Sequence, residues 1–190
     1  MNEDELQLIA ATCLYLASKL VDDKPFSLFQ LHLCGDRTYT NEEILYFETK
    51  ILNSIHWYLS TPTIHDFVSI YLESTREMNR KCFWLSHCLA EYALQLSLCL
   101  NYSPSTIAAS AVALSRYAIY NNKSFPEDLS KLTGYSIMSI GPCIIDLSTS
   151  LGQQSSIFYA IWNRYNKTSR CHAISKIGDL SVRVDLEKMK

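Results

Sequence analysis

Glycine and proline are scarce in this 190-residue chain, which has five of each. Both residues are frequent in the turns of loop-rich β proteins, so their scarcity argues against that class. The chain also lacks an apolar run of the roughly 20 residues that a membrane helix needs. Its longest nearly unbroken apolar run, residues 8–21, is better explained as a buried helix, and the acidic residues after Met1 do not suit a secretion signal.

An excess of charge of either sign is missing as well. The chain has 17 Lys and Arg residues against 19 Asp and Glu residues, which gives a net charge of −2. This balance provides no broad basic surface for nucleic acid or for an anionic membrane, so neither is an expected partner.

Signs of catalytic or metal chemistry are absent from the sequence. None of the seven cysteines forms a CxxC motif, and the adjacent His-Cys and Cys-His pairs have a poor geometry for one zinc ion. There is no Gly-rich phosphate loop, and the histidines have no partner at a useful spacing. We therefore expect no catalytic residue, no metal site and no cofactor, and we expect that the protein is not an enzyme.

A repeated motif is the main positive signal. Ile-Ala-Ala-Thr at residues 9–12 recurs as Ile-Ala-Ala-Ser at residues 107–110, which is 98 positions later. Each copy begins an apolar run with helical periodicity. A repeat of this length has the size of a small domain rather than of a solenoid unit, so it indicates two related helical units in tandem.

Helical spacing of apolar residues predicts an all-α fold. In the first unit the expected helices cover residues 3–22, 26–34 and 41–56, and Thr40 with Glu43 forms a capping-box pattern at the start of the third. In the second unit they cover residues 64–75, 79–98, 103 to about 120, 126–132 and 136–151, and a final helix covers residues 155–167. The expected domains are residues 1–60, 61–152 and 153–190, the last being a C-terminal helix and tail.

The two units are not expected to be equally complete. Forty-one residues, 62–102, precede the second copy of the motif and suffice for two helices, whereas only eight residues precede the first copy. We therefore expect the chain to begin within its first domain, which would hold about three helices against five in the second. The helix at residues 8–21 is apolar on nearly all sides, so several of its large side chains should then face water.

Several segments, in order, resemble mitotic cyclins of the A and B types, and the A-type wording is closest. The segments are Leu-Gln-Leu-Ile-Ala at 6–10, Leu-Ala-Ser-Lys at 16–19, Thr-Tyr-Thr at 38–40, Ser-Pro-Ser-Thr-Ile-Ala-Ala at 103–109, Phe-Pro-Glu-Asp-Leu at 125–129 and Thr-Gly-Tyr at 133–135. The resemblance implies tandem cyclin folds, of which the first lacks its N-terminal part.

The resemblance also implies a function. Cyclins are regulatory subunits in cell-cycle control, including mitosis, that bind a cyclin-dependent protein kinase and hold its mobile helix inward. Lys19 and Glu48 match the key charged contacts of the family, although from the residues alone they also suit solvated helix ends. The family's apolar contact positions are matched by Leu20, Leu52, Trp57 and Leu59.

A second family site is only partly represented. Gln7 matches a position in the groove that docks Arg-x-Leu motifs of substrates and inhibitors. Most of that groove belongs to the first helix of the first cyclin box, which this sequence does not contain. The resemblance further implies a location in the nucleus and cytoplasm.

Two other interpretations remain open. The chain could be a truncated cyclin-fold fragment without kinase-activating ability, which the missing helices favour. It could also be a transcription adaptor with tandem cyclin folds, but such a protein should carry basic faces, and the net charge of −2 speaks against it.

Overall fold

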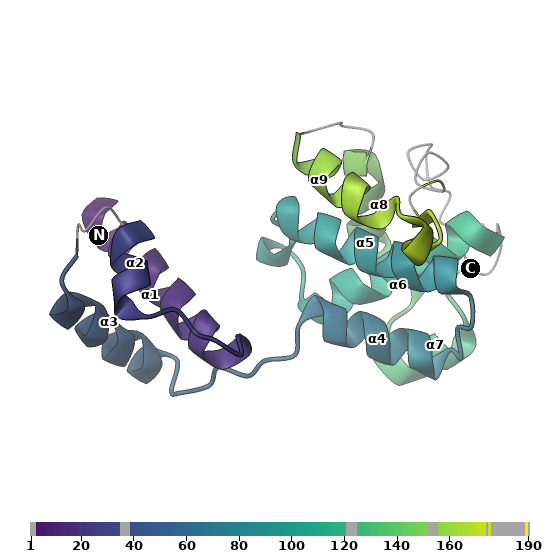
Figure 1. The fold of residues 1–190 in the computed structure, drawn as a ribbon. Coiled ribbons are helices and arrows are strands. Elements are labelled where there is room, and N and C mark those ends of the chain that lie inside the picture. Colours follow the sequence, from purple (N-terminus) through teal and green to yellow (C-terminus); the bar gives the residue numbers. More distant parts are fainter. Residues whose placement is uncertain are drawn as a thin grey trace. The chain divides into compact units, whose positions relative to one another are not determined.

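The chain folds into two compact units, Met1–Thr61 and Pro62–Lys190. The computed structural model describes residues 3–34, 39–120, 125–151, 156–173, 175 and 189. All regular structure within these ranges is helical, and they contain no strand (Figure 1). The predicted all-α fold class is therefore confirmed.

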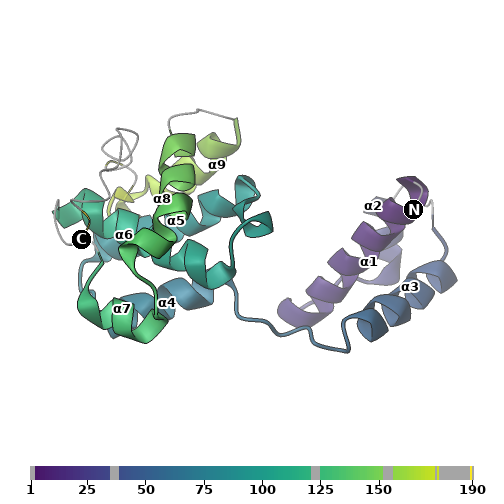
Figure 2. The ribbon, with the colours of Figure 1, turned by 180° about the vertical axis from the view of Figure 1, so that it is seen from behind.

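The described residues of the first unit form three helices, as expected. They are α1 (Glu3–Val21), α2 (Leu28–Cys34) and α3 (Asn41–Ser54), and α1 and α3 lie side by side in both ribbon views (Figures 1 and 2). The small core of this unit contains Leu8, Tyr15, Leu31, Tyr39 and Ile44. Because these side chains come from all three helices and the α2–α3 connection, the core holds the whole unit together.

The third helix starts where the sequence predicts. The Thr40 side chain accepts a hydrogen bond from the Glu43 backbone N–H at 3.2 Å, and the Glu43 carboxylate accepts one from the Thr40 N–H at 2.8 Å. This reciprocal pair is the expected capping box, and it satisfies two donors that the helix leaves without a partner. The backbone hydrogen bond lowers the pKa of Glu43, followed by the hydrogen bond from the Thr40 hydroxyl.

Among its described residues, the second unit contains the five helices expected of it, followed by the helix expected near the C-terminal end. Their bounds are α4 (Ile64–Ser74), α5 (Arg80–Gln95), α6 (Pro104–Tyr120), α7 (Glu127–Thr133), α8 (Ile137–Leu151) and α9 (Ser156–Tyr165). Two short 3-10 turns, Leu98–Leu100 and Thr168–Arg170, follow α5 and α9.

Helix α6 is the centre of the second unit, where it contacts α4, α5 and α8. Its alanines at 108, 109, 111 and 113 have no exposed surface, and Leu114 is equally buried. Alanine favours the helix and has a short side chain, so the neighbouring helices can approach closely. Buried hydroxyls are satisfied within the helices, as when Ser115 donates to the Val112 carbonyl at 2.9 Å.

Two histidines stack where α4 meets α5. The rings of His65 and His87 lie 5.0 Å apart with an angle of 9° between their planes, and their Nδ1 atoms are 2.8 Å apart. His87 is buried, and its Nε2 has no partner among the described residues. Burial, and secondarily the nearby His65, lowers the pKa of His87 to about 4.

The first prediction concerns the unequal enclosure of the two motif-bearing helices. We expect the amides of α6 to exchange with solvent only when the second unit unfolds, and those of α1 to exchange much faster, since one side of α1 is open to water. Hydrogen exchange on the whole chain measures both helices in one sample. Equal, strong protection of α1 and α6 in a monomer would contradict this expectation.

The second prediction concerns pH. In the unfolded chain His87 should titrate near 6.5, whereas in the folded chain its pKa is about 4. The folded state therefore binds fewer protons between these values, so stability is complete above about pH 6.5 and is lost as the pH falls toward 4. The loss is of the order of 3 kcal/mol.

Denaturant unfolding of the second unit at pH 7 and pH 4.5 measures this loss. His87→Gln should show a smaller difference between the two pH values than the parent chain. His172→Gln provides the control for the loss of a histidine outside the buried pair, because His172 is exposed. An equal difference in the parent chain and in His87→Gln would count against the assignment to His87.

Candidate functional site

Lys19 and Glu48, which the sequence identifies as candidate contact residues, meet on the surface of the first unit. Lys19 lies in the last turn of α1 and Glu48 lies in α3, and the packing of these helices sets their Nζ and Oε1 atoms 2.7 Å apart. The sequence predicted the two residues separately. Their mutual ion pair follows from the packing of α1 against α3.

The aromatic ring of Tyr15 completes the environment of Lys19. Tyr15 lies one helical turn before Lys19, and the Lys19 ammonium lies 4.1 Å from the ring centroid. Burial acts to lower the pKa of Lys19, but the hydrogen bonds to Glu48 and Tyr15 and the attraction to both groups outweigh it, so the pKa is raised. The ammonium therefore stays charged, and it has three donors with which to bind more than one acceptor.

The four apolar candidates differ in how accessible they are. Trp57 is 64% exposed and Leu20 is 53% exposed, whereas Leu59 is half-buried. Leu52 is only 7% exposed, so in the free chain it acts as a core residue. A partner can therefore reach Trp57 and Leu20 directly, but Leu52 only after side chains move.

A strained turn presents Trp57 to solvent. Its own φ angle is +59° and that of His56 is +52°, so two consecutive non-glycine residues adopt the left-handed conformation. The turn is held by the Trp57 N–H, which donates to the Leu52 carbonyl at 2.8 Å, and by the indole N–H, which donates to Asn53 Oδ1 at 3.1 Å. The indole is thus both fixed and exposed, which suits an interface anchor.

Sequence reasoning missed two aromatic residues that lie beside the candidate residues in sequence or in space. Tyr58, which follows Trp57, is 68% exposed, and Tyr15 lies under the Lys19 ammonium. The sequence did contain a signal for Tyr58, because the large aromatic residues Trp57 and Tyr58 are adjacent just before the polar segment at residues 60–63. The role of Tyr15 depends on its spacing of four residues from Lys19, which places both on one side of the helix.

Gln7 lies apart from the ion pair. It is exposed on the first half of α1, twelve residues before Lys19, which corresponds to about 18 Å along a helix. The structure therefore does not bring the candidate docking residue together with the candidate kinase contacts.

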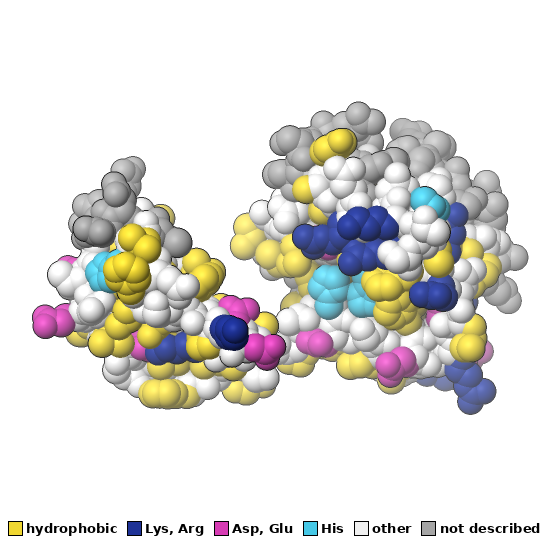
Figure 3. All heavy atoms as spheres, in the orientation of Figure 1, with side chains coloured by type: hydrophobic (Ala, Val, Ile, Leu, Met, Phe, Trp, Pro, Cys, Tyr) yellow, Lys and Arg dark blue, Asp and Glu magenta, His cyan; other side chains and the backbone are white. Residues whose placement is uncertain are grey.

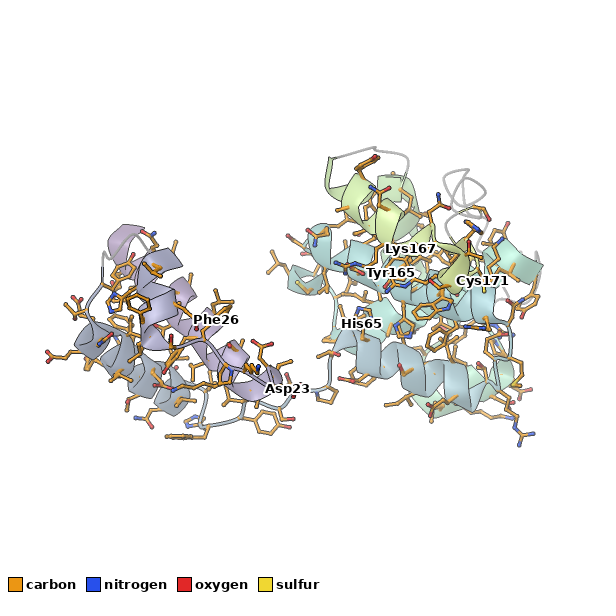
Figure 4. All side chains as sticks on the ribbon, viewed as in Figure 1. Asp23, Phe26, His65, Tyr165, Lys167 and Cys171 are labelled. Carbon is orange, nitrogen blue, oxygen red and sulfur yellow. The ribbon has the colours of Figure 1, made fainter. Side chains whose placement is uncertain are left out.

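The second unit carries a different kind of surface. Lys and Arg side chains gather beside histidine side chains on the face seen in Figure 3. Arg170 lies 4.7 Å from the ring centroid of Tyr165 and 5.2 Å from that of Trp84, and Arg164 forms an ion pair with Glu91. Tyr165 and Lys167 lie at the end of α9 and just beyond it, and His65 lies at the start of α4 (Figure 4).

Metal and membrane sites receive no support from the described part of the chain. Its residues contain no group of three or more His, Cys, Asp or Glu side chains that could hold a metal ion. None of its helices is both long and apolar enough to cross a membrane.

Comparison with known proteins identifies the family. Residues 1–60 match the family described as "Cyclin, N-terminal domain", and residues 62–180 match "Cyclin, C-terminal domain". The chain belongs to the cyclin family. The two matches meet next to the boundary between the two compact units, so each unit of this cyclin corresponds to one family domain.

The similar curated proteins include A-type cyclins of animals. Cyclin-A2 of Gallus gallus is 34% identical over 175 residues, which are 91% of this chain and 44% of the relative. Cyclin-A2 of Homo sapiens and "G2/mitotic-specific cyclin-A" of Spisula solidissima are each 32% identical over 173 residues, which are 90% of this chain and 40% of each relative. The predicted A-type resemblance is confirmed, and the cyclin spans less than half the length of these relatives.

The third prediction concerns the strained turn. His56 is exposed, so its replacement removes little packing, and glycine adopts a positive φ without the steric cost of a side chain. We expect His56→Gly to stabilise the first unit by about 0.5–1 kcal/mol, measured by hydrogen exchange of the α3 amides. Ser54→Gly, two residues earlier but inside the helix, should weaken the same amides. Faster exchange in His56→Gly would refute the strain.

Proposed function

We propose that this cyclin is a regulatory subunit that binds and activates a cyclin-dependent protein kinase in cell-cycle control, including mitosis. The family match and the A-type relatives support a regulatory, non-enzymatic role. The observation that carries the proposal is the Lys19–Glu48 pair on the surface of the first unit. We propose that the protein acts in the nucleus and cytoplasm, without nucleic acid or membrane as partners.

The proposed kinase-binding surface consists of Lys19, Leu20, Glu48, Leu52, Trp57 and Leu59. Its charged residues offer a donor and an acceptor side by side, which can fix the orientation of a partner segment. Leu20, which follows Lys19 in sequence, and Trp57 offer exposed apolar area on the same unit. A charged centre with aromatic and aliphatic anchors is a common composition of specific protein interfaces.

In this proposal the cyclin acts on the position of a kinase helix. An active kinase needs its conserved lysine paired with a glutamate on a mobile helix, and inward movement of that helix completes the pair. A surface of the cyclin that binds the inward position better than the outward one shifts the equilibrium toward activity. The cyclin thus contributes binding energy and takes no part in phosphoryl transfer.

The Lys19–Glu48 pair costs little to redirect toward the kinase. Both side chains reach the surface, and exposed ion pairs contribute only about 0–1 kcal/mol. On binding, Lys19 can keep Glu48 as one acceptor and use its other donors for kinase groups. The pair therefore holds the two side chains ready without competing strongly against the partner.

We also propose that Gln7 takes part in docking Arg-x-Leu motifs of substrates or inhibitors. Its exposed side-chain amide supplies both a donor and an acceptor for a peptide backbone. Leu6 beside it is 53% exposed and offers apolar surface for the leucine of such a motif.

A second candidate function is supported by the open side of α1. Three leucines of this helix are each 53% exposed, which is a large exposed apolar area for one helix. This observation favours a cyclin-fold segment that does not activate a kinase. Binding and activation must therefore be measured separately.

The fourth prediction tests the kinase-binding surface. Loss of a charged contact that becomes buried in a complex costs on the order of 2–5 kcal/mol. Lys19→Ala combined with Glu48→Ala should therefore weaken kinase binding, measured by calorimetric titration, by at least tenfold. Kinase activity toward a peptide substrate should fall in parallel at a fixed concentration of the cyclin.

The matched control uses the second ion pair between the same helices. Lys50 of α3 and Glu5 of α1 lie 4.0 Å apart, so Glu5→Ala with Lys50→Ala removes an equal number of charges elsewhere on the unit. This control should bind and activate as the parent chain does. Full activation by the Lys19 and Glu48 double variant would sink the proposed surface, and binding of the parent chain without activation would favour the second candidate function.

A further inference from the structure

Lys19 is held between a carboxylate and an aromatic ring. Its Nζ atom lies 2.7 Å from Glu48 Oε1 and 4.1 Å from the ring centroid of Tyr15. The Lys19 side chain is still 39% exposed, and an exposed ion pair by itself fixes a long lysine side chain only weakly. The ring is therefore the second contact that restricts where the ammonium lies.

The ring of Tyr15 is itself fixed by the core of the first unit. Tyr15 is only 7% exposed, and it belongs to the same buried cluster as Leu31 of α2 and Ile44 of α3. A side chain packed in a core cannot follow a moving lysine, and this one leaves almost no surface for a partner. Tyr15 can therefore influence a bound protein only through the residue that lies over its ring.

Helix geometry brings the ring and the ammonium together. Tyr15 precedes Lys19 by four residues, which places both on one side of α1. Side chains of a helix point back toward its N-terminus, so a lysine lies over the turn that precedes it. The contact with the ring thus follows from α1 alone, and Glu48 adds a contact from α3. Two helices of the unit together define one position for the ammonium.

We infer that Tyr15 is a positioning residue of the proposed kinase-binding surface, an inference that rests on the proposed function. A lysine that is already ordered loses little conformational freedom when a kinase acceptor binds it, so more of the binding energy is retained. The face of an aromatic ring also attracts a positive charge. The ring of Tyr15 thus holds the Lys19 ammonium beside Glu48 and makes it ready for the kinase.

A second lysine of the same unit has neighbours of the same kinds but is held less closely. Lys50 Nζ lies 4.9 Å from the ring centroid of Phe47 and 4.0 Å from Glu5 Oε1. Both distances exceed those at Lys19, and the Lys50 side chain is 55% exposed. Because Lys50 is not part of the proposed surface, the ring of Phe47 provides a matched control.

Calorimetric titration of the whole chain with the purified kinase of the fourth prediction measures the effect of the ring. Tyr15→Leu keeps a buried apolar side chain but removes the ring, and we expect it to weaken kinase binding about three- to tenfold. Tyr15→Phe keeps the ring and should bind within about twofold of the parent chain. Phe47→Leu removes the ring beside Lys50 and should bind as the parent chain does.

A double-mutant cycle with Lys19→Ala separates positioning from a structural role. If Tyr15 acts through Lys19, Tyr15→Leu should change the affinity of a Lys19→Ala chain by less than about twofold, because no ammonium is left to position. If Tyr15→Leu disturbed the fold of the first unit instead, it would weaken binding equally with and without Lys19.

NMR spectroscopy of the free chain adds a measurement that needs no kinase. The ε-methylene protons of Lys19, identified by their loss in Lys19→Ala, should be shifted by the ring current of Tyr15. The shift should remain in Tyr15→Phe and disappear in Tyr15→Leu. Protons at the ordinary position of an exposed lysine in the parent chain would overturn the positioning by the ring.

The binding results separate this inference from the proposed function. A loss of affinity in Tyr15→Leu that requires Lys19 and is absent in Tyr15→Phe supports the inference. Unchanged binding by Tyr15→Leu, an equal loss with and without Lys19, or an equal loss in Tyr15→Phe overturns the inference alone. A parent chain that does not bind the kinase, or a Lys19→Ala chain that binds as tightly as the parent, overturns the proposed function and the inference with it.

Discussion

The enclosure of an alanine-rich helix is the constraint on which the fold depends. Helix α6 has no polar side, so it is stable in water only when other helices surround it, and α4, α5 and α8 do so. Its alanines at 108 and 109 have no exposed surface. The equivalent positions of α1, Ala10 and Ala11, are exposed and half-buried. The alanines of the same motif are thus buried in α6 and partly exposed in α1. The neighbouring helices that pack against each of them explain this difference in burial.

Local signals made the helices predictable from the sequence. Proline, glycine and capping residues mark their ends, so the start of α3 at Thr40 and of α6 at Pro104 follow from short segments. Burial was less predictable because it depends on long-range packing. The apolar residues between Leu6 and Leu20 recur at helical spacing, and this pattern is compatible with a buried side of a helix as well as with an exposed one. Only the packing of α1 against α3 shows which of these residues are buried.

In the candidate site, too, some features follow from short sequence segments and others only from long-range packing. Sequence resemblance could find Lys19 and Glu48 as matching positions, but these residues are 29 positions apart in sequence, and their contact depends on how α1 and α3 pack together. The turn that presents Trp57 was hidden for another reason. Left-handed backbone is usually marked by glycine, whereas here His56 and Trp57 adopt it themselves. Hydrogen bonds from Trp57 to Leu52 and Asn53 hold this turn without a glycine, so the usual sequence marker of left-handed backbone is missing.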